Sequence, residues 1–222
     1  SDVYKRQLSG GLSTTGTGAF ITIQNAPSLT TGNITATSGT VVLGVGQDIT
    51  GDVNQTSGTT IAAGTLNVST GGKAELTAAN NNISNLGTVT TGGLFSLTSN
   101  SAALKLTGAS NVDGSYTISN TGSLNLSTQD ITATGNVSLT GGGISQSAGS
   151  QAILIRGAGT VALGSLSASS GTVVIGQGDI TGAVTQSAST TITAATLTGN
   201  VTSSAVLDKA NAIDTLAGFK SG

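Results

Sequence analysis

The chain repeats itself at long range, and this repeat constrains its fold more than any other feature. Residues 38–44 read SGTVVLG and return at 170–176 as SGTVVIG, while residues 48–55 return at 179–186, which makes a super-repeat of about 131 residues. A globular enzyme gains nothing from such repetition. In a solenoid each unit packs only on its neighbours, so units can be duplicated. The repeat therefore predicts a solenoid.

The repeat also sets the expected domain organisation. The match continues as far as residues 76–86 and 207–216, and the second copy begins near residue 168 and is cut short at residue 222. We expect residues 8–222 to form one repetitive segment cut from a longer array. Residues 1–7 (SDVYKRQ) do not match the rest and resemble a translated sequencing-adapter tail, so we treat them as a non-native tail outside the fold prediction.

Composition argues against a single thick core. The chain has 34 glycines, 29 serines and 38 threonines, but only 3 phenylalanines, 2 tyrosines and no tryptophan or methionine. Its apolar residues make up 36% of the chain and are mostly small aliphatics in short runs. Small aliphatics can fill thin repeated layers, whereas a large globular core needs more aromatic volume.

Charge and cysteine content exclude several partners and cofactors. The net charge is −2 and the seven cations are scattered, so no basic surface is expected to attract nucleic acid. No apolar run reaches the roughly 20 residues that a membrane span needs. Without cysteine, the chain has no disulfides and no thiolate metal sites. We therefore expect no cofactor, no metal, no nucleic acid and no membrane span.

Hydrophobicity alternates with a period of two, which is typical of half-buried strands. Glycine-rich steps separate the runs, and we expect these glycines to supply positive φ at corners. The one helix-like window, residues 206–213, has a strand-and-turn counterpart near residue 76, so it is predicted to be non-helical. The clearest strands are expected at residues 19–23, 66–69, 94–98, 103–107, 124–127 and 137–140, with corners at 71–72, 92–93, 135 and 141–143.

Short strands at ten-residue spacing fit an antiparallel sandwich or barrel, or a parallel β-helix. The long repeat, the small aliphatics and the near absence of Asn-Gly or Asp-Gly hairpin turns favour the β-helix. We predict an all-β, right-handed parallel β-helix of roughly 20 residues per coil, with about ten or eleven coils and a length on the order of 50 Å at ~4.8 Å per coil. Residues 80–82 and Asn211 are expected at turns, where amides hydrogen-bond between coils.

The segments at residues 76–87 and 207–219, together with Gly-Asp-Ile-Thr at 178–181 and Gly-Asn-Val-Ser/Thr at 135–138 and 199–202, resemble filamentous-haemagglutinin-like bacterial exoproteins. The resemblance covers roughly residues 8–222 and rests on repeat texture. It implies a right-handed β-helical shaft of a very large adhesin, exported by two-partner secretion across a Gram-negative outer membrane. The secretion domain of that family is not part of this sequence.

Acidic residues are the first candidates for chemistry. Asp48 and Asp52 would share a face of one extended strand, but they straddle a glycine, and the second copy replaces Asp52 by alanine. A groove in which Asp48 and Asp52 converge with Asp113, Asp130 and Asp179 would indicate a polysaccharide-active enzyme. Residues 44–48 (GVGQD) echo the Gly-x-Gly-x-Asp of calcium-binding repeats, although no tandem nonapeptides follow. We predict solvated turn acids in each case.

Two further surface chemistries are open. Seven Asn-x-Ser/Thr triplets match the glycosylation pattern, although a chain this rich in the three residues forms such triplets by chance. Thr-x-Thr strings at 35–37, 88–90 and 191–193 could order water if they stacked, but their spacing is not uniform. The triplets begin at Asn33, Asn54, Asn67, Asn82, Asn125, Asn136 and Asn200.

The sequence thus predicts a structural and adhesive shaft segment of a large secreted bacterial surface adhesin, without catalytic, cofactor or metal-binding residues. Its expected partners are a host or neighbouring cell surface, protein or glycan, and an outer-membrane secretion protein. A β-helical polysaccharide-active enzyme and a passive stalk that displays a distal toxin domain are the alternatives.

Overall fold

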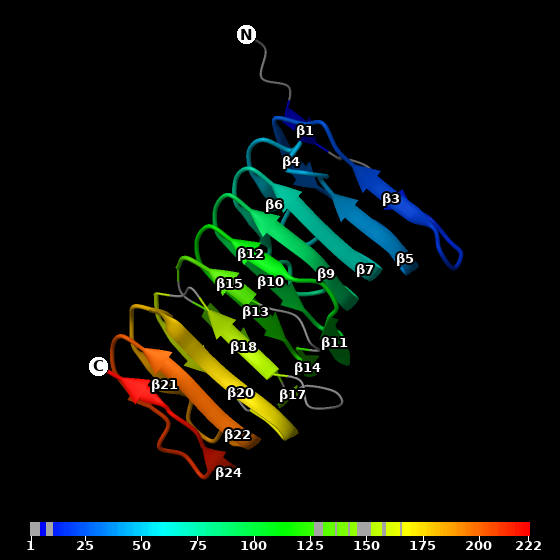
Figure 1. Ribbon diagram of the computed structural model, residues 1–222. Helices are drawn as coiled ribbons and strands as arrows, with labels where there is room; N and C mark the ends of the chain where they lie inside the picture. Colours follow the sequence, from blue (N-terminus) through cyan, green and yellow to red (C-terminus); the bar gives the residue numbers. More distant parts are fainter. Residues whose placement is uncertain are drawn as a thin grey trace.

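The computed structural model describes residues 5–7, 11–126, 131–135, 137–141, 143–145, 152–156, 159–164 and 166–222. Every element in these ranges is a β-strand, and every strand pairing is parallel. The strands stack as a solenoid of about nine turns with roughly 21 residues per turn. In Figure 1 the chain descends from its N-terminus at the top to its C-terminus at the lower left. The nearer strands run from right to left and the chain returns behind them, so the coil is right-handed. The predicted fold class is confirmed.

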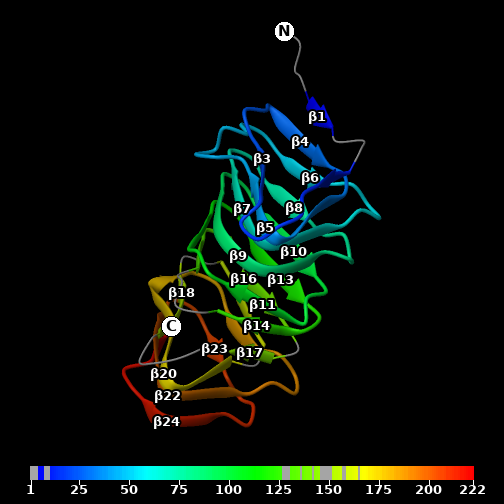
Figure 2. The ribbon, with the colours of Figure 1, turned by 90° about the vertical axis from the view of Figure 1, so that its right-hand side faces the viewer.

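Two sheets run along the solenoid. Sheet A crosses each coil once, and Figure 2 brings β4, β6, β8, β10 and β13 of this sheet into view. Its ten strands are β1 (Lys5–Gln7), β4 (Ser28–Thr31), β6 (Val53–Gln55), β8 (Ala74–Leu76), β10 (Phe95–Ser99), β13 (Tyr116–Asn120), β16 (Val137–Thr140), β19 (Val161–Leu163), β21 (Val184–Gln186) and β23 (Ala205–Val206).

Sheet B contains the other fifteen strands and bends at a corner, so each coil has three walls. The corner interrupts the register of the long strands, for example between Ala36 and Thr40. The strands of sheet B are β2 (Leu12–Ser13), β3 (Phe20–Ile23), β5 (Ile34–Leu43), β7 (Ile61–Thr70), β9 (Asn82–Thr91), β11 (Ala103–Leu106), β12 (Ser110–Val112), β14 (Ser123–Asn125), β15 (Ile131–Ala133), β17 (Gly143–Ser145), β18 (Ala152–Arg156), β20 (Leu166–Ile180), β22 (Ile192–Val201), β24 (Ala212–Leu216) and β25 (Lys220–Ser221).

The long sequence repeat is a whole number of coils. In sheet A, Val53, Ala74, Phe95, Tyr116 and Val137 pair in succession, evenly spaced at roughly 21 residues per turn. Two longer coils follow, in which Val137 pairs with Val161 and Val161 pairs with Val184. Val184 lies six coils beyond Val53 and is its counterpart in the sequence repeat. The duplicated unit therefore ends in register with its own beginning.

Fewer coils form than the sequence predicted. About nine turns are present rather than ten or eleven, because several coils contain more residues than the expected 20. Leu29 pairs with Val53, and Val137 with Val161, so each of these two coils is longer than the usual length of roughly 21 residues. At ~4.8 Å per turn, the described stack is about 43 Å long.

The core consists of inward-facing aliphatics that stack on one another. Strand β7 alternates between buried and half-buried residues, with Leu66 fully buried. In register, Val41 lies on Leu66, Leu66 on Leu86 and Leu86 on Leu106, all within 1% exposure. A fully buried aliphatic of this kind contributes about 1.5–3 kcal/mol.

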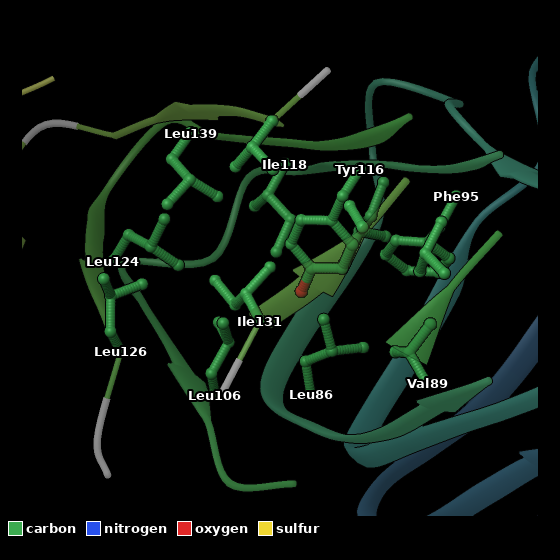
Figure 3. Packing of buried hydrophobic residues seen from close by; sticks show 14 of the residues in the cluster. Leu86, Val89, Phe95, Leu106, Tyr116, Ile118, Leu124, Leu126, Ile131 and Leu139 are labelled. Atoms are coloured by element: carbon green, nitrogen blue, oxygen red, sulfur yellow. The ribbon is translucent and has the colours of Figure 1, made fainter. Parts of the chain in front are cut away.

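One aromatic step interrupts the aliphatic columns. The rings of Phe95 and Tyr116 stack with centroids 5.4 Å apart, and Figure 3 shows them inside the core with Ile118 beside them. Both side chains are fully buried. The Ser110 hydroxyl donates a hydrogen bond of 3.0 Å to the Tyr116 hydroxyl oxygen, which gives the buried phenol a polar partner. Burial raises the pKa of Tyr116 well above its ordinary value.

The corner glycines serve a different purpose from the one predicted. Gly71, Gly92 and Gly135 lack positive φ, which occurs at loop glycines such as Gly44 and, among the stacked corner glycines, at Gly114. A Cβ on Gly92 would collide with the carbonyl oxygen of Gly71 in the preceding coil. At this position the backbones of successive corners approach closely, which leaves no room for a side chain on Gly92.

Side-chain amides join adjacent coils, as the asparagine-rich turns predicted. Asn81 is fully buried, and its Oδ1 accepts hydrogen bonds from the Ile61 backbone N–H and the Gln55 side chain, at 2.8 and 2.7 Å. In the second copy, Asn211 accepts from Ile192 N–H and the Gln186 side chain, both at 2.8 Å. The duplication therefore reproduces the same hydrogen-bonded arrangement six coils further along.

Both ends of the described chain lie in the sheets. Residues 5–7, from the segment predicted to be a non-native tail, form β1 and pair with β4. Their origin remains a prediction. The window 206–213 contains parts of strands β23 and β24 and no helix, as predicted. No helix among the described residues is long and apolar enough to cross a membrane.

Candidate functional site

A glycine-containing loop follows β5 at the edge of sheet B. Gly44, Gly46 and Gln47 have φ of 84°, 58° and 62°, so the chain turns sharply here. Asp48 closes the turn, because its Oδ1 accepts a hydrogen bond of 2.8 Å from the Val45 N–H. The Gln47 N–H donates to Ser69 Oγ at 2.8 Å, which ties the loop to the next coil. These two hydrogen bonds fix the loop against the neighbouring coil.

A groove of about 500 Å³ lies between this loop and the outer face of sheet B. The loop forms one wall, and the outward-facing Asn67, Thr88 and Thr90 contribute to the floor. Asn67 Oδ1 accepts from the Thr88 N–H at 2.9 Å, which fixes the amide across the strands. None of the described residues that line this part of the groove is charged.

The hollow continues along the solenoid. An adjoining groove of about 620 Å³ shares Gln47 and Thr90 with the first and extends to Asn111, Asp113 and Thr134. The two together, here called groove 1, cross the coils from β5 to β15. With four steps between five coils at ~4.8 Å each, groove 1 is about 19 Å long.

The second copy of the sequence repeat forms an equivalent groove, here called groove 2. It has a volume of about 460 Å³ and lies beside the irregular end of β20, where the register shifts and Gly176 and Gly178 have positive φ. Val174 pairs with Thr198 there, as Val42 pairs with Asn67 in the first copy. Groove 2 also contains Gln177, Asn200 and Lys220.

The corresponding glycine in each copy cannot be replaced without moving the neighbouring coil. A Cβ on Gly44 would collide with the carbonyl oxygen of Ser69, and one on Gly176 would approach that of Asn200. The positive φ of both glycines is a second restriction. The two copies therefore place a glycine at positive φ against the next coil in the same way, before a loop in the first copy and within the bulged end of β20 in the second.

The acidic residues do not converge. Asp48 and Asp52 are not in one extended strand, as the pairing hypothesis required, because the chain turns between β5 and β6. Asp52 Oδ1 accepts from Lys73 N–H at 3.1 Å, and Asp179 Oδ1 accepts from Gln177 N–H at 2.8 Å. Asp113 lies in groove 1. These acids hold separate turns, and Asp130 lies outside the described residues.

The calcium-like string at residues 44–48 forms the loop that follows β5. The Asp48 carboxylate there accepts a backbone hydrogen bond within its own turn. In the described ranges, no three acidic side chains come close enough together to form a metal site.

The glycosylation triplets differ in their surroundings. Asn82 and Asn200 are exposed, while the Oδ1 atoms of Asn33 and Asn67 accept the backbone N–H groups of Thr60 and Thr88, both within 2.9 Å. Asn54 and Asn125 are half-buried, and Asn136 lies outside the described residues. Modification at these sites remains a prediction.

The Thr-x-Thr strings do not stack on one another. Thr35 pairs with Ser13 and Ala62. Thr90 pairs with Ser69 and Asn111. The non-uniform spacing predicted from the sequence is therefore confirmed for these threonines.

An ion pair marks the outer face of sheet A. Lys73 Nζ lies 2.5 Å from Glu75 Oε2, and both side chains are 38% exposed. The hydrogen bond and charge of Glu75 raise the pKa of Lys73 above its ordinary value. The pair is exposed to solvent, so its contribution to stability is small.

Sequence reasoning named several groove residues, among them Asn67, Asp113 and Asn200, for other chemistries, but it predicted no groove. The available signal was the pair of glycine-containing strings at 44–48 and 176–179, which recur at the same place in both copies. Comparison with models of known families, with curated proteins and with solved structures found no significant match. The resemblance to filamentous-haemagglutinin-like exoproteins therefore remains a prediction.

Proposed function

We propose that residues 8–222 form a structural and adhesive shaft segment of a large secreted bacterial surface adhesin. The observation that carries this proposal is the in-register duplication, in which Val53 and Val184 occupy the same column of sheet A six coils apart. A unit that ends in register with its beginning can be added repeatedly, and each addition lengthens the rod without changing its cross-section.

The surface supports adhesion through spread contacts. Grooves 1 and 2 place hydroxyl and amide groups on the same wall of the rod in both copies of the repeat. Export through an outer-membrane secretion partner, display on the cell surface and contact with a host or neighbouring cell belong to this proposal. They derive from the family resemblance of the repeats.

Adhesion of coated beads tests the proposal. Beads carrying the 222-residue chain would be added to epithelial cell layers and to bacterial lawns, with albumin-coated beads as the control. Retention above the albumin level on either surface is the expected result. Retention at the albumin level would instead favour a passive stalk. Release of sugars from an anionic polysaccharide such as polygalacturonate would favour the enzyme of similar architecture.

A further inference from the structure

Three side chains in groove 1, those of Asn67, Thr90 and Asn111, have polar groups that are free to bind a ligand. In the part of the chain that the structure describes, neither Asn67 Nδ2 nor the Thr90 hydroxyl makes a hydrogen bond to the protein. The side chain of Asn111 is exposed in the same groove and likewise makes no hydrogen bond to the described protein. The floor therefore offers donors and acceptors that only water or a ligand can satisfy.

Charge restricts the ligand. Among the side chains that the structure describes, groove 1 has one charged group, the carboxylate of Asp113, whereas groove 2 contains the cation of Lys220. The features common to both grooves are uncharged: glycines at positive φ, a glutamine, and hydroxyl or amide side chains on the floor. A ligand that fits both copies of the repeat is therefore polar and neutral.

Backbone pairing excludes an added peptide strand. Strands β7 and β9, which form the floor of groove 1, are paired on both sides with neighbouring coils. A peptide could not extend the sheet there, and the groove crosses the strands rather than following them. A chain ligand would lie along the rod axis and bind through its own hydroxyl groups.

We propose that grooves 1 and 2 are binding sites for neutral oligosaccharides, which lie along the solenoid axis and hydrogen-bond to Asn67, Thr90 and Asn111, and to Thr198 and Asn200. This inference rests on the proposed adhesive function and names its ligand class. No aromatic side chain among the described residues lines either groove, so a sugar has no ring there to stack on. Each site alone is weak, and the duplication supplies avidity toward a polysaccharide that spans both.

A titration followed by amide NMR of the ¹⁵N-labelled chain tests the inference. The probes are maltohexaose, cellohexaose, xylohexaose and mannohexaose at millimolar concentration, with a heparin hexasaccharide and a Gly-Ser peptide for comparison. The expected result is saturable shift changes near Thr90 and Thr198 with at least one neutral sugar. Binding of none of the four, or of heparin or the peptide alone, would overturn the inference.

Substitutions at the groove floor identify the site. Thr90→Arg and Thr198→Arg place a long side chain in each groove and should weaken binding about tenfold or more, as expected when a contact at the centre of an interface is lost. Thr117→Arg is the matched control, because Thr117 is a half-buried threonine on the outer face of sheet A. Equal affinity in the Thr90→Arg, Thr198→Arg and Thr117→Arg variants would contradict the assignment.

The sugar and bead experiments can fail separately. If beads adhere to cells but no neutral hexasaccharide binds, the adhesive function stands and the ligand class is wrong. If a hexasaccharide binds and beads do not adhere, the grooves are sugar sites and the adhesive function is wrong. Beads coated with the Thr90→Arg, Thr198→Arg double variant link the two, because they should lose retention that the Thr117→Arg beads keep.

Discussion

The side chains of Gln55 and Asn81 form a reciprocal amide pair between adjacent coils. Gln55 Nε2 donates to Asn81 Oδ1 at 2.7 Å, and Asn81 Nδ2 donates to Gln55 Oε1 at 2.8 Å. Asn81 Nδ2 also lies 3.1 Å from the carbonyl oxygen of Leu76. One asparagine therefore satisfies several polar groups at a turn where regular strand pairing is interrupted.

Removal of this amide should destabilise the solenoid. Asn81→Ala leaves the Ile61 N–H and the Gln55 amide without their partner, and a buried polar group left unpaired costs about 1–3 kcal/mol. The expected result is a lower midpoint of urea unfolding followed by circular dichroism. Asn82→Ala is the control, because Asn82 is exposed and its replacement should change the midpoint little. Equal midpoints for the two variants would contradict the role of the pair.

The buried Tyr116 predicts a loss of stability at alkaline pH. Its pKa is raised in the folded chain by burial, from an ordinary value of 10.0, so the unfolded chain loses this proton first. Its contribution is fully present below pH 10 and declines above it, with a slope of up to about 1.4 kcal/mol per pH unit.

Tyr116→Phe should remove that part of the pH dependence. The variant loses the hydrogen bond from Ser110 at every pH, so its stability is lower at pH 8. Between pH 9 and 11, the difference in unfolding free energy between the variant and the original chain should become smaller. Urea midpoints across this range measure the effect, and a constant difference would show that Tyr116 does not titrate with unfolding.

The corner glycines should respond to substitution according to the space beside them. Gly92→Ala forces a methyl group against the Gly71 carbonyl and should cost about 1–3 kcal/mol through overpacking. At Gly11 the nearest atoms to a new Cβ are 3.7 Å away and φ is not positive, so Gly11→Ala should be neutral or slightly stabilising. Thermal unfolding compares the two. A larger loss at Gly11 would contradict the steric account.

Part of this structure was readable from the sequence. The long repeat and the period of two predicted a parallel β-helix, and the asparagine-rich turns predicted hydrogen bonds between side-chain amides of adjacent coils. The structure confirms both predictions. Glycines were correctly predicted at the corners, but the predicted reason, positive φ, was wrong for most of them. Positive φ and close backbone approach both select glycine, and the sequence alone does not distinguish them.

The grooves could not be predicted, because they depend on which outward side chains become neighbours. The pairing register between β7 and β9 shifts by one residue between Leu66 and Val68. This shift places Ser69 opposite Thr90. A slip of one residue changes the face of a strand side chain, and nothing in the local sequence marks this shift.

The most direct test of the account is to duplicate the six-coil unit. A second copy of residues 53–183 would be inserted before Val184, which preserves the register of every coil. Small-angle scattering should show a longest dimension increased by about 29 Å, six steps of ~4.8 Å, with the cross-sectional radius unchanged. A wider cross-section, or an unchanged length, would contradict the claim that the repeat is a whole number of coils in an extendable shaft.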